Sequence, residues 1–117
     1  MTAAQTQFRL SLICEIGRCE FCGLTRVDLA LHEVARGGSR QEALDKRYAV
    51  VCLCDDCHAS LHRMAGDDQR ALGLALIKRN RPADYSLSQF HLLTDRNYPS
   101  AESVTLWLRR LNFVPSR

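Results

Sequence analysis

The chain lacks any long hydrophobic run. No apolar segment in its 117 residues approaches the roughly 20 residues that a membrane-spanning helix needs, and no charged-then-apolar leader opens the sequence. We therefore expect a soluble, intracellular protein with a cytoplasmic location and no membrane partner. Internal repeats, low-complexity tracts and an evident linker are missing too. Because this length fits one domain, the sequence favours a single domain over residues 1–117.

Strong charge of either sign is also missing. The formal net charge is +3, from 16 Lys and Arg against 13 Asp and Glu. The positive excess lies in the second half of the chain, over residues 67–117. A mild excess of this kind is compatible with a nucleic-acid partner but does not establish one.

What the chain does have is two CxxC pairs, Cys19 with Cys22 and Cys54 with Cys57. Four thiolates in two such pairs, separated by enough chain for a hairpin, are the ligands that a tetrahedral structural zinc needs. Disulfides are the alternative, but CxxC pairs flanked by histidine in a chain without a leader favour a reducing compartment. A domain of this size has a modest core, so a structural metal would add appreciably to its stability.

Histidines form a second pattern around these cysteines. His58 directly follows the last cysteine, and His62 lies four residues later on the same helical face. His32 ends an apolar stretch and is followed by Glu33. A zinc ion held by four cysteines does not need these histidines. We therefore expect a second metal site at His32, His58 and His62, with Glu33 beside it.

Other conspicuous residues have simpler interpretations. Cys14 and Cys52 have no CxxC partner, so we expect them to be buried small apolar residues. His91 is expected to be an ordinary helix residue. Trp107 and the C-terminal leucines should belong to the core rather than to a partner surface.

The order of elements indicates an α+β fold. Residues 1–13 favour a strand or a docking segment, and residues 24–34 and 48–53 favour two antiparallel strands. Ser39 followed by Glu42 is a capping-box pattern. Helices are expected over about residues 40–46, 54–65, 67–80, 86–93 and 101–111, with Asp67 capping the third of them.

These features together resemble the HNH endonuclease family, and in particular short HNH proteins of phages and prophages. The resemblance rests on the first CxxC pair, a strand ending in His32-Glu33, a second strand, and the second CxxC pair followed by His58. It covers about residues 19–62. It implies a zinc-stapled ββα-metal core over about residues 14–66, followed by additional C-terminal helices over about residues 67–117.

The resemblance also implies roles for single residues. His32, His58 and His62 fall on positions that bind a catalytic divalent ion such as Mg²⁺, Mn²⁺, Ni²⁺ or Zn²⁺. Glu33 falls on the general-base position, where the family more often has histidine. The central asparagine of the family signature would fall near Ala49 and is absent. That departure leaves a weakened or inactive nuclease open.

The chemistry of phosphodiester hydrolysis fits these positions. It requires an activated water, charge stabilisation on the phosphoryl oxygens and help for the leaving oxygen, and a divalent ion with a nearby base can supply all three. Four basic residues between the strands are placed to hold phosphates on either side of the cut: Arg36, Arg40, Lys46 and Arg47.

The sequence therefore predicts a metal-dependent DNA endonuclease or nickase, with room for a protein partner in phage DNA processing. One alternative is a non-catalytic zinc module that binds DNA or a protein, which the missing asparagine favours. A redox-sensing or purely structural zinc protein is the third interpretation. Convergence of the three histidines on one point would favour the nuclease over the module.

Overall fold

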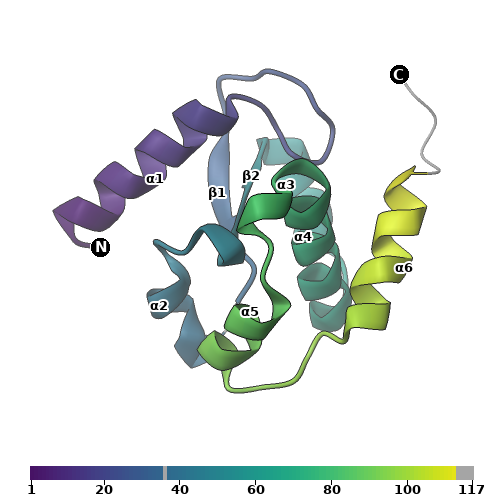
Figure 1. Cartoon of the computed structure of the whole chain (residues 1–117). Helices are drawn as coiled ribbons and strands as arrows, with labels where there is room; N and C mark the ends of the chain where they lie inside the picture. The colour runs from purple at the N-terminus through teal and green to yellow at the C-terminus, as the bar shows by residue number, and fades with distance from the viewer. Residues whose placement is uncertain (36, 113–117) are drawn as a thin grey trace.

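The computed structural model describes residues 1–35 and 37–112, and over these residues it shows six α-helices around a two-stranded sheet (Figure 1). The expected α+β class is confirmed. The helices are α1 (Ala3–Ile16), α2 (Arg40–Ala43), α3 (Asp55–His62), α4 (Gly66–Asn80), α5 (Leu87–Thr94) and α6 (Ala101–Asn112). The strands are β1 (Ala30–Glu33) and β2 (Val50–Leu53), and short 3₁₀ turns span Gly37–Ser39 (η1), Arg47–Ala49 (η2) and Pro82–Asp84 (η3). None of the described helices is long and apolar enough to cross a membrane.

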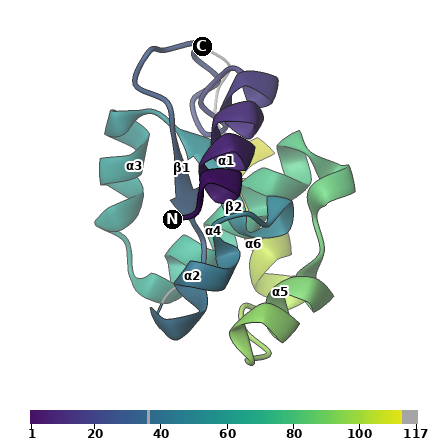
Figure 2. The same ribbon diagram turned by 90° about the vertical axis from the view of Figure 1, so that its left-hand side faces the viewer.

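The two strands pair antiparallel and bury both faces of β2. His32 lies opposite Val51 and Glu33 opposite Val50. Because side chains alternate along a strand, Val50 and Cys52 face a small cluster with Leu12 of α1, whereas Val51 and Leu53 join the main core. The sheet therefore lies between α1 on one side and α4 on the other (Figures 1 and 2).

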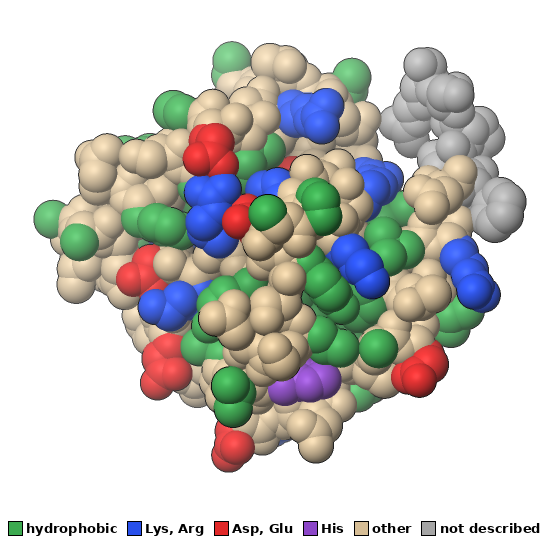
Figure 3. All heavy atoms as spheres, in the orientation of Figure 1, with side chains coloured by type: hydrophobic (Ala, Val, Ile, Leu, Met, Phe, Trp, Pro, Cys, Tyr) green, Lys and Arg blue, Asp and Glu red, His purple; other side chains and the backbone are tan. Residues whose placement is uncertain are grey.

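Helix α4 is the centre of the main core. Its residues are buried on every side through the middle of the helix: Leu72, Leu74, Ala75, Leu76 and Ile77. Helix α6 packs against α4 and buries Val104 and Leu111, while Trp107 is half-buried against the core. On the face that carries α5 and α6, acidic and basic side chains are interspersed, and hydrophobic ones gather between these helices (Figure 3).

A close approach fixes α4 against the end of β1. A Cβ atom at Gly73 would lie 2.8 Å from Cγ2 of Val34, so a larger residue at this position would force the two elements apart. Val34 follows directly after Glu33, the last residue of β1. The contact therefore places the strand end that carries His32 and Glu33 on a rigid helix.

The N-terminal segment differs from the prediction. Residues expected to form a strand or docking segment form the helix α1, which begins with a reciprocal cap: Gln5 N–H donates to Thr2 Oγ1 at 3.0 Å, and Thr2 N–H donates to Gln5 Oε1 at 2.8 Å. The expectation for Cys14 was also wrong, because its place on α1 leaves it exposed. Cys52, in contrast, is buried as expected.

The first predicted strand is shorter than expected. Only Ala30–Glu33 of residues 24–34 pairs with β2. The preceding loop is held by Asp28, whose carboxylate accepts from Arg26 at 2.9 Å and from the N–H of Asp55 at 3.0 Å. Asp28 therefore serves as a cap for the start of α3, a role that excludes it from a regular strand.

Two of the predicted helix caps, at Ser39 and Asp67, do not form. Ser39 precedes α2 but makes no side-chain cap hydrogen bond, and α2 ends early at Ala43. Helix α4 begins at Gly66 rather than after Asp67, and Asp67 pairs instead with Arg70 within the first turn. A cap does form at α5, where Ser86 accepts the N–H of Gln89.

Candidate metal centres

The four cysteines of the CxxC pairs come together in one cluster. Cys19 and Cys22 lie in the loop between α1 and β1, Cys54 directly precedes α3, and Cys57 lies in its first turn. Their Sγ atoms all lie within 4.8 Å of one another, and all four are free thiols. This cluster, called the cysteine centre below, is close enough to hold a metal ion.

A tight turn gives the first pair its geometry. The N–H of Gly23 donates to the carbonyl of Cys19 at 2.9 Å, and the N–H of Cys19 donates to the carbonyl of Leu24 at 3.0 Å. Gly23 has φ 79°, in the left-handed region that favours glycine. The turn folds the chain back on itself, so that the thiols of Cys19 and Cys22 lie on the same side of it.

Burial and backbone hydrogen bonds act in opposite directions on the thiols of the cysteine centre. Burial raises the pKa of Cys22 and of Cys57, because removal from water disfavours the thiolate. Burial also opposes ionisation of Cys19, but hydrogen bonds from the backbone N–H groups of Cys22 and Cys54 outweigh it and lower the pKa of Cys19. A divalent cation would compensate the buried charge of all four thiolates, since coordination deprotonates a thiol.

A buried ion pair locks the first turn to the rest of the fold. The side chain of Glu20 is 0 % exposed, and its two carboxylate oxygens accept from Nε and Nη2 of Arg81, each at 3.0 Å. Arg81 also donates to the carbonyl of Val50, and the N–H of Glu20 donates to the carbonyl of Cys52 at 2.8 Å. Sequence reasoning missed this pair, because its partners are far apart in the chain and no local pattern links them.

The three predicted histidines also converge. His32 projects from β1, and His58 and His62 lie one turn apart on α3. His32 Nδ1 lies 3.1 Å from His58 Nε2, and His62 Nε2 lies 3.0 Å from the same atom. One nitrogen from each ring falls within 4.8 Å of the others. We call this cluster the histidine centre.

These spacings match those of imidazoles that share one ion. Two nitrogens bound at roughly 2.0 to 2.1 Å, with ligand angles of roughly 90 to 110°, lie roughly 2.9 to 3.4 Å apart. Burial, followed by the charge of His62, lowers the pKa of His58. His58 is therefore neutral at physiological pH, which is the form of imidazole that binds metals. Chemically, the histidine centre can hold a divalent cation.

The histidine centre lies in an open cleft of about 650 Å³. Its walls come from β1, α1, α2 and α3, which surround this side of the sheet (Figure 2). His32 lies at the buried end of the cluster, with 6 % of its surface exposed, whereas His62 is exposed. A small ligand can therefore approach the cluster from the side of His62.

Glu33 lines the same cleft but is held by two arginines. Its Oε2 accepts from Arg9 at 3.1 Å and its Oε1 from Arg40 at 3.1 Å. Burial alone would raise the pKa of Glu33, but the hydrogen bond from Arg40 and the charge of Arg9 outweigh burial and lower it. The carboxylate is therefore ionised at neutral pH and is a weaker base than a free glutamate.

The two arginines differ in how firmly they are held. Arg9 also donates to the carbonyls of Leu31 and Leu44, at 3.2 and 2.8 Å, so it is fixed on three sides. Arg40 has a side chain that is 69 % exposed, and its hydrogen bond joins it to Glu33. Arg9 was not predicted as a site residue. The Thr2-x-x-Gln5 cap signal could have placed α1 and so drawn attention to it.

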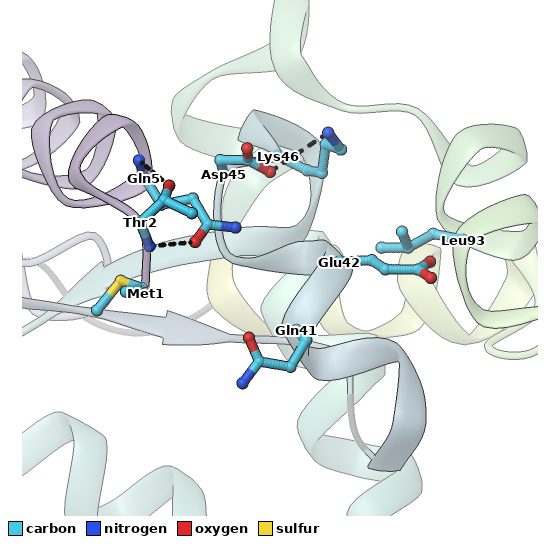
Figure 4. A pocket seen from close by; sticks show the side chains of 8 residues that line it. All are labelled: Met1, Thr2, Gln5, Gln41, Glu42, Asp45, Lys46 and Leu93. Carbon is cyan, nitrogen blue, oxygen red and sulfur yellow. Dashed lines mark hydrogen bonds and ion pairs between the residues drawn. The ribbon is translucent and has the colours of Figure 1, made fainter.

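Of the four predicted phosphate contacts, the three that the structure describes are not brought together. Arg40 lines the histidine cleft. Lys46 pairs with Asp45 at 3.3 Å and lines a different surface pocket, between the start of α1 and α2 (Figure 4). Arg47 forms ion pairs with Glu15 and Asp84, and Arg36 lies outside the described residues.

Comparison with known proteins does not assign the chain to a family: no family model, no curated protein and no solved structure matches it. The two centres therefore have to be interpreted from their own geometry.

Proposed function

We propose that the chain is a metal-dependent, HNH-type DNA endonuclease or nickase. The observation that carries the proposal is the histidine centre: three imidazoles from a strand and a helix meet within 4.8 Å in an open cleft, beside a carboxylate held by arginines. A core histidine that only packs or accepts one hydrogen bond does not need two further imidazoles beside it.

The cysteine centre is proposed to hold a structural zinc ion. Four thiolates favour zinc over harder cations, and a site with four protein ligands is closed to substrate. Cys19 and Cys54 are almost fully buried, in keeping with a site that stabilises the fold. Cys54 and Cys57 also fix the start of α3, the helix that carries His58 and His62.

His32, His58 and His62 are proposed to hold the catalytic divalent ion. Three protein ligands leave coordination positions open, as catalytic sites require. When bound, such an ion polarises the phosphodiester and stabilises the leaving oxygen. The exposed side of the cluster, at His62, is where the phosphate would enter.

Glu33 and its arginines complete the proposed site. The ionised carboxylate of Glu33 can accept the proton of an attacking water. Arg9, fixed by two carbonyls, holds this carboxylate in place. Arg40 is exposed enough to reach a substrate phosphate, and its departure from Glu33 would free one carboxylate oxygen to act as the base.

A non-catalytic zinc module that binds DNA or a protein is the second candidate, and Ala49 is the observation that favours it. Ala49 is buried, and the asparagine of the HNH signature would fall near it. Its backbone nevertheless ties the segment before β2: its N–H donates to the carbonyl of Lys46 at 3.0 Å, and its carbonyl accepts from Val34 at 2.9 Å. Backbone hydrogen bonds thus supply the support for the loop without the asparagine.

A plasmid-nicking assay separates the two candidates. Supercoiled DNA is incubated with the zinc-loaded protein and Mg²⁺, Mn²⁺, Ni²⁺ or Zn²⁺, alongside His32→Ala and His58→Ala. We expect metal-dependent nicking that both variants lose while they keep zinc and the parent's circular dichroism. His91→Gln is the matched control, because His91 lies on α5 and is not among the residues that line the cleft. Its Nε2 lies 2.7 Å from the carbonyl oxygen of Pro99. A parent that cuts with none of these metals supports the binding module instead.

A further inference from the structure

A smaller pocket of about 280 Å³ opens next to the histidine cleft, and Gly37 lines both. Three separate parts of the chain form its walls: the turn η1, the first half of α4, and the end of α5 with the segment that follows it. Its lining residues are Gly37, Gly38, Ser39, Arg70, Thr94, Arg96 and Tyr98. Its volume is several times the roughly 30 Å³ that a water molecule occupies in the liquid.

Two arginines line the pocket, and the charge of one of them is offset by Asp67 next to the wall. Arg70 and Arg96 line it, and no Asp or Glu is among the described residues of its wall. Arg70 is held in place, since it pairs with Asp67 at 2.7 Å and lies 5.5 Å from the centre of the Tyr98 ring. Arg96 is exposed, and within the described part of the chain its guanidinium has no hydrogen bond or ion pair. An anion in this pocket would therefore meet the exposed Arg96, with Arg70 beside it already paired to Asp67.

Neutral groups around the pocket favour an oxygen-rich ligand. The hydroxyl of Ser39 makes no cap hydrogen bond. Burial, followed by the charge of Asp67, raises the pKa of Tyr98, whose protonated hydroxyl is already directed to Asp67. A Cβ atom at Gly38 would meet nothing within 4 Å, so the backbone here borders open space. Guanidinium forks and hydroxyl donors are the groups that bind phosphate in proteins.

We propose that this pocket binds a backbone phosphate of DNA, on the strand that enters the histidine cleft and beyond the phosphate that is cut. The location rests on the proposed function, because the shared wall at Gly37 makes the pocket a continuation of that cleft. The chemistry recognised is a phosphate group. Free inorganic phosphate presents the same chemistry, and the experiment below separates the two sources.

The first arm measures DNA binding without a catalytic metal, by fluorescence anisotropy of a labelled duplex at several salt concentrations. Arg96→Ala should weaken binding to all sequences alike and reduce the slope of log K against log salt by about 0.9, the share of one phosphate contact. Arg109→Ala is the matched control, since Arg109 is also exposed but lies on α6 away from the pocket. It should keep the parent's slope.

Gly38 allows a second pair of variants in the same arm. Its φ is not positive and it has open space at its Cβ position, so a side chain fits without backbone strain. Gly38→Asp places a carboxylate at the pocket and should reduce the salt slope as Arg96→Ala does. Gly38→Asn has the same shape without the charge and should bind DNA as the parent does.

The second arm follows the amide signals of Gly38 and Ser39 by NMR while inorganic phosphate is added. Selective loss of DNA affinity in Arg96→Ala and Gly38→Asp supports the proposal, even if the parent nicks no DNA and the proposed function fails. Unchanged DNA binding, with phosphate shifts that vanish in Arg96→Ala, overturns the DNA assignment in favour of free phosphate. If Arg96→Ala matches Arg109→Ala and phosphate shifts neither amide, the pocket binds no phosphate and the proposal is wrong.

Discussion

The cysteine centre and the histidine centre have donor atoms packed within the same 4.8 Å, yet they differ in exposure. Cys19 and Cys54 are buried in the core and Cys22 and Cys57 are half-buried, whereas the histidine centre runs from the buried His32 to the exposed His62 on the wall of a cleft. The comparison teaches that donor spacing alone does not separate a structural metal site from a reactive one. The two kinds of site are separated by access to solvent and by open coordination positions.

Helix α3 links the two centres. Cys54 directly precedes it, its first turn carries Cys57, and the rest of the helix carries His58 and His62. A metal at the cysteine centre would therefore orient two of the three histidines. We therefore expect substitutions at the cysteine centre to disrupt both sites. Substitutions at the histidine centre should leave the fold intact.

The largest effect is expected for Cys54→Ser. Structural zinc contributes on the order of 10 kcal/mol of apparent binding free energy, comparable to the whole stability of a typical domain at about 5–15 kcal/mol. The variant should lose zinc and its cooperative thermal unfolding, measured by metal analysis and circular dichroism. Cys14→Ser changes an exposed thiol outside the centre and should melt like the parent. An unchanged melting curve for zinc-free parent protein would refute the structural role.

The next largest effect should be on catalysis alone. His58 is the shared neighbour of the other two imidazoles, so His58→Ala removes the central one of the three proposed ligands. A metal that stabilises transition-state charge contributes several kcal/mol, and each 1.36 kcal/mol is a factor of about ten in rate. Nicking should therefore fall by about a thousandfold or more, with zinc content and melting temperature close to the parent's. Equal loss of fold and activity would remove the distinction between the centres.

The buried ion pair of Glu20 with Arg81 provides a test of how the turn that carries Cys19 is held in the fold. Arg81→Met leaves the fully buried carboxylate of Glu20 without its partner. Loss of one partner from a buried pair costs about 3–5 kcal/mol, so we expect a clear drop in the free energy of unfolding by denaturant titration. Arg109→Met, on the exposed side of α6, should cause no measurable drop. Similar stabilities for the two variants would show that Arg81 does not hold the turn at Cys19.

The smallest effect concerns the base. Glu33→Gln keeps the shape of the side chain but cannot accept a proton, and general-base catalysis contributes roughly 10²–10⁴ in rate. We expect a loss near the lower end, because Arg9 and Arg40 already weaken Glu33 as a base. Single-turnover nicking measures the role of Glu33 in catalysis, and thermal melting measures its role in stability. Full activity with a lower melting temperature would make Glu33 a structural ion-pair partner only.

Local patterns predicted which cysteines and histidines come together. The spacing of Cys19, Cys22, Cys54 and Cys57 was enough to place four thiols in one cluster, because each CxxC pair is fixed by one turn of chain. His58 and His62 lie on one helical face by their spacing alone. The apolar run of α4 was equally clear, since it is buried throughout its middle.

Long-range contacts could not be predicted in this way. The link between Arg9 and Glu33 joins α1 to β1, and α1 itself was missed because its apolar residues do not form one clear helical face. Asp28 looked like a strand residue, since nothing near it in the chain reveals that it would accept from Asp55. The pairing of Glu20 with Arg81 depends on the complete fold. Local periodicity carries no information about such contacts.

The central claim, a second and open metal centre at the three histidines, is tested most directly by titrating zinc-loaded protein with Co²⁺ under visible and near-ultraviolet absorption. The account predicts one additional ion per chain, with d–d bands but no new thiolate charge-transfer band, and loss of this ion in His58→Ala while zinc stays bound. A parent that binds no additional ion, or a His58→Ala variant that binds it as tightly as the parent, would contradict the account.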